Sequence, residues 1–401
     1  FSADTILSHK HWIEATIGHN STQTGTITRH FPTSITTQRP KRPLSVTSIM
    51  PKSLQIRGAD KIGIKDVEKP CPEGNQILVK VVASGQNPLD VAVVCITASV
   101  AEFVDYYNGN TIGCDFAGIV EAVGPQTTRF QPGDRVGGFL PGNLQEQGAF
   151  VEESFSTRLP ASMPFEYAAT IGVAASTAAI ALYSHLNLPR YGNGAKPFNQ
   201  YLLVNGGSSA TGTMIIQIAK LSGARVIALT SPRNFDLVKS YGADKAFDYQ
   251  HPDVAAMIRD YTGDAVGLAV NCLPTRESCK LICDCISSTG GRCVNLVPVD
   301  TSDAEFRKDV DFSLFMAFQV FNKDFQLGSD MYAASQDLRE LVKDFWKQID
   351  EEFMPRNSLK IHPVKIIQNG LEGVPESHKQ MLDGQVSGWK FVARIADTPG
   401  I

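Results

Sequence analysis

A run of glycine and small hydroxyl residues in the middle of the chain has the composition of an anion-binding turn. The run follows an apolar segment, residues 201–204, and precedes apolar positions at helical spacing from Thr213 onward. A strand, a glycine turn and a helix in this order bring backbone N–H groups and the positive end of a helix dipole together, as binding of a nucleotide pyrophosphate requires. The residues predicted to contact the pyrophosphate are Gly206, Gly207, Ser208, Ser209, Ala210, Thr211 and Gly212.

The segment after this turn indicates which nucleotide is bound. Residues 225–230 are predicted to be a second buried strand, and its end is where a dinucleotide fold recognises the adenosine ribose. A site for NAD would place Asp or Glu there, whereas this chain has Ser231, Arg233 and Asn234. A hydroxyl, a guanidinium and an amide suit a 2′-phosphate, which a carboxylate would repel. We therefore expect NADPH as the cofactor. The alternative is a solvated turn that opens a helix over residues 234–241.

Two further segments supply candidate catalytic residues. Asn87 and Asp90 follow a predicted strand over residues 76–83. Their amide and carboxylate could act in catalysis, or they could only brace the loop, which is their commoner structural role. Residues 171–182 form a predicted helix of small side chains, which lets backbone and cofactor approach closely. Thr177 is its candidate polar contact, and the alternative is a tightly packed helix between domains.

Length and composition indicate a globular protein of two domains. A chain of 401 residues usually exceeds one hydrophobic core. The net charge of -4 gives no reason to expect nucleic acid as a partner. No apolar run approaches the ~20 residues of a membrane span. The eight cysteines form no regular framework, which favours a reducing compartment and a cytoplasmic location.

Residues 1–49 differ in composition from the rest of the chain. They begin with Phe, are rich in Ser and Thr, and carry more basic than acidic residues. Such a segment is predicted to be disordered. It could be an organelle transit peptide. It could also be a gene-model artefact with Met50 as the true start, which we favour because folded-looking sequence begins directly after Met50.

Four sequence motifs occur in a fixed order before the nucleotide-binding segment. They are Asn87-Pro88-x-Asp90, Gly113-x-Asp115-x-x-Gly118-x-Val120, Gly133-Asp134-Arg135-Val136 and Gly148-Ala149-Phe150. In this order they resemble the medium-chain dehydrogenase/reductase superfamily, from about residue 52 to residue 396. Residues 206–212, 231–240, 247–249 and 384–390 also resemble the fungal trans-acting enoyl reductases that serve polyketide synthases.

The resemblance implies an α/β fold and a set of site residues. A Rossmann dinucleotide-binding domain would comprise residues 171–324, and a GroES-like, β-rich catalytic domain would comprise residues 50–170 and 325–398. The helix over residues 171–182 would face the nicotinamide and the substrate. Further residues implied to lie along the cofactor are Tyr249, Leu296, Val297, Val386, Ser387 and Lys390.

Metal binding can be judged residue by residue. Zinc members of the superfamily place Cys near the Asn87 region and Gly-His-Glu at the Gly113 position, where this chain has Cys114 and Asp115. A catalytic zinc needs three N, S or O ligands, and the four-cysteine structural loop is absent between residues 136 and 148. We expect a zinc-free enzyme with no metal. The later cysteines are expected to pack as small apolar residues; they are Cys272, Cys279, Cys283, Cys285 and Cys293.

A zinc-free site that holds NADPH over an apolar pocket suits hydride delivery to the β-carbon of an α,β-unsaturated carbonyl. Expected polarising groups are backbone N–H groups at residues 174–176 and the Thr177 hydroxyl. Expected proton donors are Tyr106, Tyr107 or solvent. Enoyl reductases of the family often carry Lys at the position of Ala92, where it contacts cofactor or substrate, and this chain departs from that pattern.

Three functions fit these features. The first is a trans-acting enoyl reductase that works on a chain tethered to a polyketide synthase carrier domain. The second is a stand-alone reductase of quinones or small enones, and the third is a catalytically silent NADPH-binding protein. A basic rim for the phosphopantetheine arm would favour the first, with Arg190, Lys196, Arg307 and Lys308 as candidate members. The aromatic segment 312–321 could be a buried or dimer-edge strand, or could line an acyl pocket.

Overall fold

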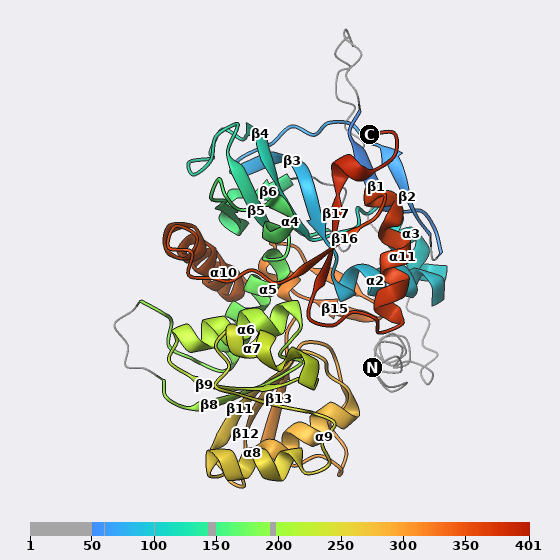
Figure 1. The fold of residues 1–401 in the computed structure, drawn as a ribbon. Helices are drawn as coiled ribbons and strands as arrows, with labels where there is room; N and C mark the ends of the chain where they lie inside the picture. The colour runs from blue at the N-terminus through green and yellow to red at the C-terminus, as the bar shows by residue number, and fades with distance from the viewer. Residues whose placement is uncertain (1–49, 60, 100, 143–149, 193–197) are drawn as a thin grey trace.

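The computed structural model describes residues 50–59, 61–99, 101–142, 150–192 and 198–401. Two sheets organise this part of the chain, one above the other in Figure 1, and helix α5 (Gly172–Ala179) lies between them. The predictions for residues 1–49, and those for Gly148, Ala149 and Lys196, fall outside the described residues.

The upper sheet contains seven strands in the described part of the chain, in the order β16-β17-β3-β4-β5-β7, with β6 also paired to β3. Its strands are β3 (Gln76–Gly85), β4 (Asp115–Val123), β5 (Arg135–Phe139), β6 (Phe150–Glu152), β7 (Ser156–Arg158), β16 (Val364–Ile367) and β17 (Lys390–Arg394). Neighbours pair antiparallel except β16 and β17. Two strands from the end of the chain therefore complete a sheet begun near its start. A separate hairpin joins β1 (Lys52–Ile56) and β2 (Ile62–Asp66).

The lower sheet is parallel throughout its described strands, in the order β10-β9-β8-β11-β12-β13. Its strands are β8 (Tyr201–Asn205), β9 (Arg225–Leu229), β10 (Lys245–Phe247), β11 (Val266–Asn271), β12 (Gly291–Asn295) and β13 (Val310–Leu314). Its helices are α6 (Ala210–Leu221), α7 (Phe235–Ser240), α8 (Val254–Thr262) and α9 (Arg276–Cys285). The strand order reverses at β8, whose neighbours are β9 and β11. In parallel sheets ligands bind outside the carboxyl ends of the strands at such a point.

The remaining elements pack around these sheets. The helices are α2 (Pro88–Ser99), α3 (Ala101–Tyr107), α4 (Phe165–Ala168), α10 (Gln336–Gln348) and α11 (Val374–Leu382), and a hairpin is formed by β14 (Phe325–Leu327) and β15 (Asp330–Tyr332). Two π-helical turns, Ile180–His185 and Ile349–Phe353, extend α5 and α10. Short 3-10 turns cover Glu153–Phe155, Pro232–Asn234, Ala317–Val320, Gly370–Gly373 and Ile395–Asp397.

Helix α5 is held from both sides because its side chains are small and buried. The largest buried apolar cluster contains Ala175 of α5 together with Phe139 of β5, Val204 of β8 and Trp346 of α10. The indole Nε1 of Trp346 donates a hydrogen bond to the Ser176 hydroxyl at 3.1 Å. The predicted inter-domain helix is therefore present, and its residues can face a site between the two sheets.

One helical run, Phe165–His185, is long and apolar enough to cross a membrane by length and composition. Within it, 78% of the most apolar window is buried inside the fold. The expectation that no apolar run approaches the length of a membrane span is therefore corrected for this run. The run contains α5, so its burial reflects the core helix just described.

The aromatic segment 312–321, for which a buried or dimer-edge strand and the lining of a pocket were both open, is only partly a strand, and its residues 315–318 line a cavity. Strand β13 begins earlier, at Val310, and ends at Leu314, where it forms one edge of the lower sheet. The chain then turns away into the 3-10 turn Ala317–Val320, because Phe318 and Phe321 pack their rings against Phe139 of the upper sheet. The segment therefore links the two sheets.

Candidate active site

A cavity of about 170 Å³ lies between the two sheets, next to the carboxyl ends of β11 and β12. Its polar lining comes from Asn87, Thr177, Thr211 and Cys272. Its apolar lining consists of Pro88, Leu89, Val173, Leu273, Pro274, Leu296, Val297, Phe315, Met316, Ala317 and Phe318. The structure thus brings Asn87, Thr177, Thr211, Leu296 and Val297, all predicted site residues, around one largely apolar space.

The glycine turn has the geometry that an anion site needs. Gly206 has φ +71°, a left-handed conformation that favours glycine. Helix α6 begins at Ala210, and the hydroxyl of its N-cap residue Ser209 accepts a hydrogen bond from the Gly212 N–H at 3.0 Å. A Cβ at Gly212 would lie 2.3 Å from the Gly206 carbonyl oxygen, so only glycine lets the helix approach the turn. These residues fit a nucleotide pyrophosphate at the start of α6.

The end of β9 forms a polar cluster with the last segment of the chain. The Asn234 amide nitrogen donates to the Ser208 hydroxyl at 3.1 Å and to the Ser387 hydroxyl at 2.9 Å. The Thr230 hydroxyl also donates to the Ser208 hydroxyl, at 2.8 Å. Ser208, Asn234 and Ser387, which were predicted from separate motifs, are therefore in contact. Ser231 is half-buried beside them, and the Arg233 side chain is exposed.

Two other predicted cofactor residues lie outside the cavity lining. Tyr249, two residues after β10, is partly buried and packs against the second apolar cluster, which lies under α8 and α9. Val386 packs against the main apolar cluster. Their predicted contacts with the cofactor stay predictions.

A buried ionic network stands directly behind Asn87. Lys390, the first residue of β17, donates its ammonium Nζ to Asn87 Oδ1 at 2.8 Å and to the Asp115 carboxylate. Asn87 Nδ2 donates to Asp115 Oδ2 at 3.1 Å, and the Val173 N–H donates to Asp115 Oδ1 at 2.6 Å. All three polar side chains are at most 6% exposed. The network joins β4, β17 and the starts of α2 and α5.

Sequence analysis named all three polar side chains of this network but did not predict that they contact one another. The resemblance placed Lys390 near the cofactor, whereas its ammonium contacts Asn87 and Asp115. Nothing local could have shown this, since Lys390 and Asp115 are 275 positions apart. Pairing of β17 with β3 brings them together.

Asp90 braces the loop before α2, which was the alternative to a catalytic role for this residue. It is fully buried, and its Oδ2 accepts the backbone N–H of Asn87 at 2.6 Å. It does not line the cavity. The carboxylate thus holds the turn that presents Asn87 at the start of α2.

The placement of Tyr107 does not agree with the predicted role as proton donor. Its side chain is 0% exposed, and its hydroxyl donates to the Gln326 carbonyl at 2.8 Å. Burial raises the pKa of the Tyr107 phenol well above its usual value. Tyr106 is exposed, and its hydroxyl accepts the Gln326 N–H at 3.3 Å. Neither ring lines the cavity, because α3 packs both rings against the β14–β15 hairpin.

The backbone groups expected to polarise a carbonyl are partly used elsewhere. Among residues 174–176, the Ala175 N–H donates to the Ile171 carbonyl at 2.8 Å, so the helix itself uses this donor. The neighbouring Val173 N–H is taken by the Asp115 side chain of β4. Thr177 remains at the cavity wall, 7% exposed.

The residues at the expected zinc position do not fit a metal ion. Asp115 is bound to Lys390 and Asn87. Cys114 is fully buried with its sulfur 3.7 Å from Asp90 Oδ1 and 3.5 Å from the Gly142 carbonyl, and burial raises the pKa of its thiol. Within the residues that the structure describes, no group of three His, Cys, Asp or Glu could hold a metal ion. A tetrahedral zinc site needs such a group.

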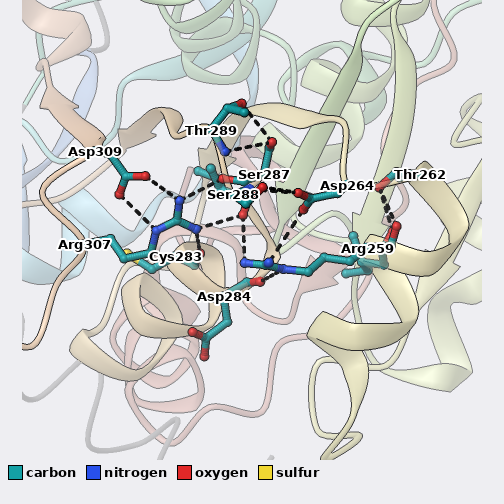
Figure 2. A network of polar contacts seen from close by, with 12 residues as sticks. Arg259, Thr262, Asp264, Cys283, Asp284, Ser287, Ser288, Thr289, Arg307 and Asp309 are labelled. Carbon is teal, nitrogen blue, oxygen red and sulfur yellow. Dashed lines mark hydrogen bonds and ion pairs between the residues drawn. The ribbon is translucent and has the colours of Figure 1, made fainter.

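The described candidates for a basic rim, Arg190, Arg307 and Lys308, do not line the cavity. Arg307 donates to the carbonyls of Cys283, Ile286 and Ser287 and pairs with Asp309 (Figure 2). These contacts lie at the end of α9 and just before β13 begins, so they face the amino ends of the parallel strands. The cavity lies at the opposite, carboxyl ends.

The other two described candidates of this rim are also engaged elsewhere. Lys308 donates to the carbonyls of Ser302 and Asp303. Arg190 pairs with Asp344 of α10 at 3.2 Å. The described candidate members of a basic rim therefore do not converge on the cavity.

Comparison with known families agrees with this architecture. Residues 73–183 match the alcohol dehydrogenase GroES-like domain, and residues 210–347 match the zinc-binding dehydrogenase family. A trans-enoyl reductase, grgB of a Penicillium species, is 33% identical over 361 residues, which cover 86% of this chain and 99% of the relative. The chain belongs to the medium-chain dehydrogenase/reductase superfamily. Its predicted fold class, a Rossmann domain with a GroES-like domain, is confirmed.

Other members of the superfamily support the same grouping. The trans-enoyl reductase caaB of Aspergillus niger is 32% identical over 375 residues, covering 88% of this chain and all of the relative. The crystal structure of the CurK enoyl reductase has a TM-score of 0.68 at 21% identity, over 86% of this chain and 99% of that one. A Pseudomonas syringae quinone oxidoreductase has a TM-score of 0.62 at 20% identity, over 85% and 99%. These two structures share the fold. The exact domain boundaries at residues 170 and 324 stay predictions.

Proposed function

We propose that this superfamily member is a trans-acting, NADPH-dependent enoyl reductase that reduces an α,β-unsaturated thioester held on a polyketide synthase carrier domain. The observation that carries the proposal is the apolar cavity. It joins Asn87, next to the start of α2, and Thr177 of α5 to Thr211 at the start of α6. This chain also aligns with curated relatives named trans-enoyl reductases over nearly the whole length of those relatives.

The chemistry follows from the groups around the cavity. Bound NADPH would supply a hydride to the β-carbon of the substrate. Asn87 and Thr177 would donate hydrogen bonds to the thioester carbonyl oxygen as negative charge develops there. The apolar wall of Leu89, Phe315 and Phe318 excludes water, which strengthens such hydrogen bonds. With Tyr107 buried elsewhere, solvent at the cavity mouth remains as the source of the α-carbon proton.

The preference for NADPH over NADH is part of this proposal. The support is the set of side chains after β9, where Ser231, Arg233 and Asn234 stand and no carboxylate lies between residues 230 and 235. Asn234 is already aligned by Ser208 and Ser387. A guanidinium and an amide in this place suit a phosphate.

A second function is favoured by one observation. Arg190, Arg307 and Lys308 pair with groups away from the cavity, which removes the described members of the expected basic rim. A stand-alone quinone or enone oxidoreductase needs no such rim. The third candidate, a catalytically silent NADPH-binding protein, rests on Ala92 and on the lack of a zinc site among the residues that the structure describes.

The test is NADPH oxidation by the full chain and by a chain that starts at Met50. Acceptors are an α,β-unsaturated pantetheine thioester and a simple quinone, and NADH is the control cofactor. Turnover of the thioester with NADPH and not NADH supports the proposal. Turnover of the quinone alone supports the stand-alone reductase. Binding of NADPH without turnover of either acceptor, even when a synthase carrier domain is added, supports the silent protein.

A further inference from the structure

The Asn87 side chain stands between two partners of opposite hydrogen-bonding character. Lys390 approaches its Oδ1 at 2.8 Å, and Asp115 Oδ2 lies 3.1 Å from its Nδ2. An ammonium group can only donate hydrogen bonds, and a carboxylate can only accept them. The amide of Asn87 can therefore satisfy both partners in one orientation only. A flipped amide would place N–H against ammonium and carbonyl against carboxylate.

This fixed orientation decides what Asn87 offers to the cavity. Its Oδ1 is directed to Lys390, and Nδ2 carries two hydrogens, of which Asp115 takes one. Among the described residues, Asp115 is the acceptor for this amide. The second N–H belongs to a side chain that lines the cavity and is 6% exposed. It is left for a molecule bound there.

The surrounding backbone is shaped to hold the pair. A Cβ at Gly85 would lie 2.0 Å from the Ala169 carbonyl and 3.1 Å from Lys390 Cε. A Cβ at Gly172 would lie 2.4 Å from Asp115 Oδ1. The Lys390 backbone N–H donates to the Pro363 carbonyl at 2.9 Å. Two glycines and a strand end thus leave room for one buried ammonium and one buried carboxylate at this point.

We propose that Lys390 and Asp115 are positioning residues that hold Asn87 with its second Nδ2 hydrogen directed at the carbonyl oxygen of the substrate. This inference rests on the proposed function, since it names the group that polarises the enoyl thioester. Lys390 itself does not line the cavity. Its role is to prevent the amide flip that would turn an oxygen toward the developing negative charge.

The decisive variant exchanges the two side chains, N87D/D115N. It keeps one carboxylate, one amide and the same side-chain volumes beside Lys390, but position 87 then has no N–H. Loss of one such donor in a preorganised site lowers kcat by roughly 100-fold. We expect that loss for the thioester, together with an NADPH Kd close to that of the unmodified enzyme. The Tm should fall, because Asp115 accepts hydrogen bonds on both carboxylate oxygens and an amide at position 115 replaces one of these acceptors with a donor. A kcat within about threefold of the original, in a folded variant, overturns the proposal.

The role of Lys390 is tested separately by K390M and by K390M/D115N. K390M alone leaves a buried carboxylate without its cation, which is destabilising, so it can fail for structural reasons. The double variant removes both charges and should recover the Tm. In the double variant the Asn87 amide is free to flip, and we expect its kcat to remain roughly 10-fold below that of the unmodified enzyme. Full recovery of kcat would show that Lys390 only balances charge. K365M, on the exposed face of β16, is the matched control lysine and should leave kcat unchanged.

A spectroscopic readout separates this inference from the proposed function. A saturated acyl-pantetheine thioester with a 13C carbonyl binds without reacting, so its C=O stretch reports the hydrogen bond. We expect a lower frequency in the unmodified enzyme than in water, and a return of the frequency in N87D/D115N. An unchanged C=O frequency in N87D/D115N overturns the inference. A variant that loses only affinity for NADPH also overturns it, because the Asn87 N–H would then bind the nicotinamide amide. An unmodified enzyme that neither binds nor reduces the thioester contradicts the proposed function itself.

Discussion

Asn234 Nδ2 lies 2.9 Å from the Ser387 hydroxyl, and this contact joins the end of the second nucleotide strand to the last segment of the catalytic part. Gly388 follows with φ +75°, and a Cβ there would lie 2.8 Å from Asn234 Oδ1. The amide also contacts Ser208 of the glycine turn. One asparagine therefore links the glycine turn, the segment after β9 and residues 387–388.

The first prediction concerns cofactor choice. Arg233→Ala should raise the KM for NADPH about 10-fold or more, because a charge-assisted hydrogen bond to the 2′-phosphate is lost. The KM for NADH should stay within about twofold, since NADH lacks this phosphate. Steady-state kinetics with both cofactors measure the effect. Arg356→Ala, whose side chain is 62% exposed and pairs with Glu352, is the control. An equal change in both KM values would contradict recognition of the phosphate.

A second prediction uses the close approach at the glycine turn. Gly212→Ala should abolish tight NADPH binding and lower Tm, because the new Cβ would lie 2.3 Å from the Gly206 carbonyl oxygen. Gly267→Ala in β11 is the matched control, since a Cβ there meets no atom within 4 Å. Fluorescence titration of NADPH and thermal melting measure both variants. Normal NADPH affinity in Gly212→Ala would show that α6 can move away from the turn without loss.

A third prediction tests the proton donor. Tyr107→Phe should leave kcat within about twofold of the original while the free energy of unfolding falls by about 1–3 kcal/mol, since the buried Gln326 carbonyl loses its donor. Thr177→Val removes a hydroxyl from the cavity wall and should lower kcat by about 10-fold or more. Urea denaturation and thioester kinetics distinguish the two effects. A large loss of kcat in Tyr107→Phe with normal stability would restore that tyrosine to the mechanism.

The fourth prediction is a loss of stability in acid. Burial lowers the pKa of His378 from 6.5 to about 4, and its Nε2 lies 3.2 Å from Gln86 Oε1. The unfolded chain therefore binds a proton first as pH falls, so this contribution is complete above pH 6.5 and is lost progressively toward pH 4. The full effect is about 3 kcal/mol. His378→Gln keeps a neutral hydrogen-bonding side chain.

Urea denaturation between pH 7 and pH 5 tests this point. The unfolding free energy of His378→Gln should fall less steeply with acid than that of the unmodified protein. His362, whose pKa burial lowers to about 3, remains in both proteins and contributes equally. Parallel pH dependence of the two unfolding free energies would mean that the pKa of His378 is not lowered in the folded protein.

Local patterns were sufficient for the nucleotide half of the site. The strand β8, the turn at Gly206 and the helix α6 follow from apolar spacing and glycine chemistry, which act over a few residues. The run of small residues in α5 likewise predicted a helix that others approach closely. The motif order in the first part of the chain indicated the superfamily, which the comparisons confirmed.

Only the tertiary structure decided which side chains, far apart in the sequence, contact one another. The sequence by itself determined that Asn87, Asp115 and Lys390 exist in suitable segments. The pairing of β17 with β3, and of β3 with β4, determined that they meet. The same holds for Tyr107, whose hydroxyl faces a hairpin 219 positions away, and for Arg307, which caps α9. Hydrogen bonds and ion pairs act over about 3–4 Å. Their partners are therefore set by packing of whole elements, whereas turns and helices are set by neighbours along the chain.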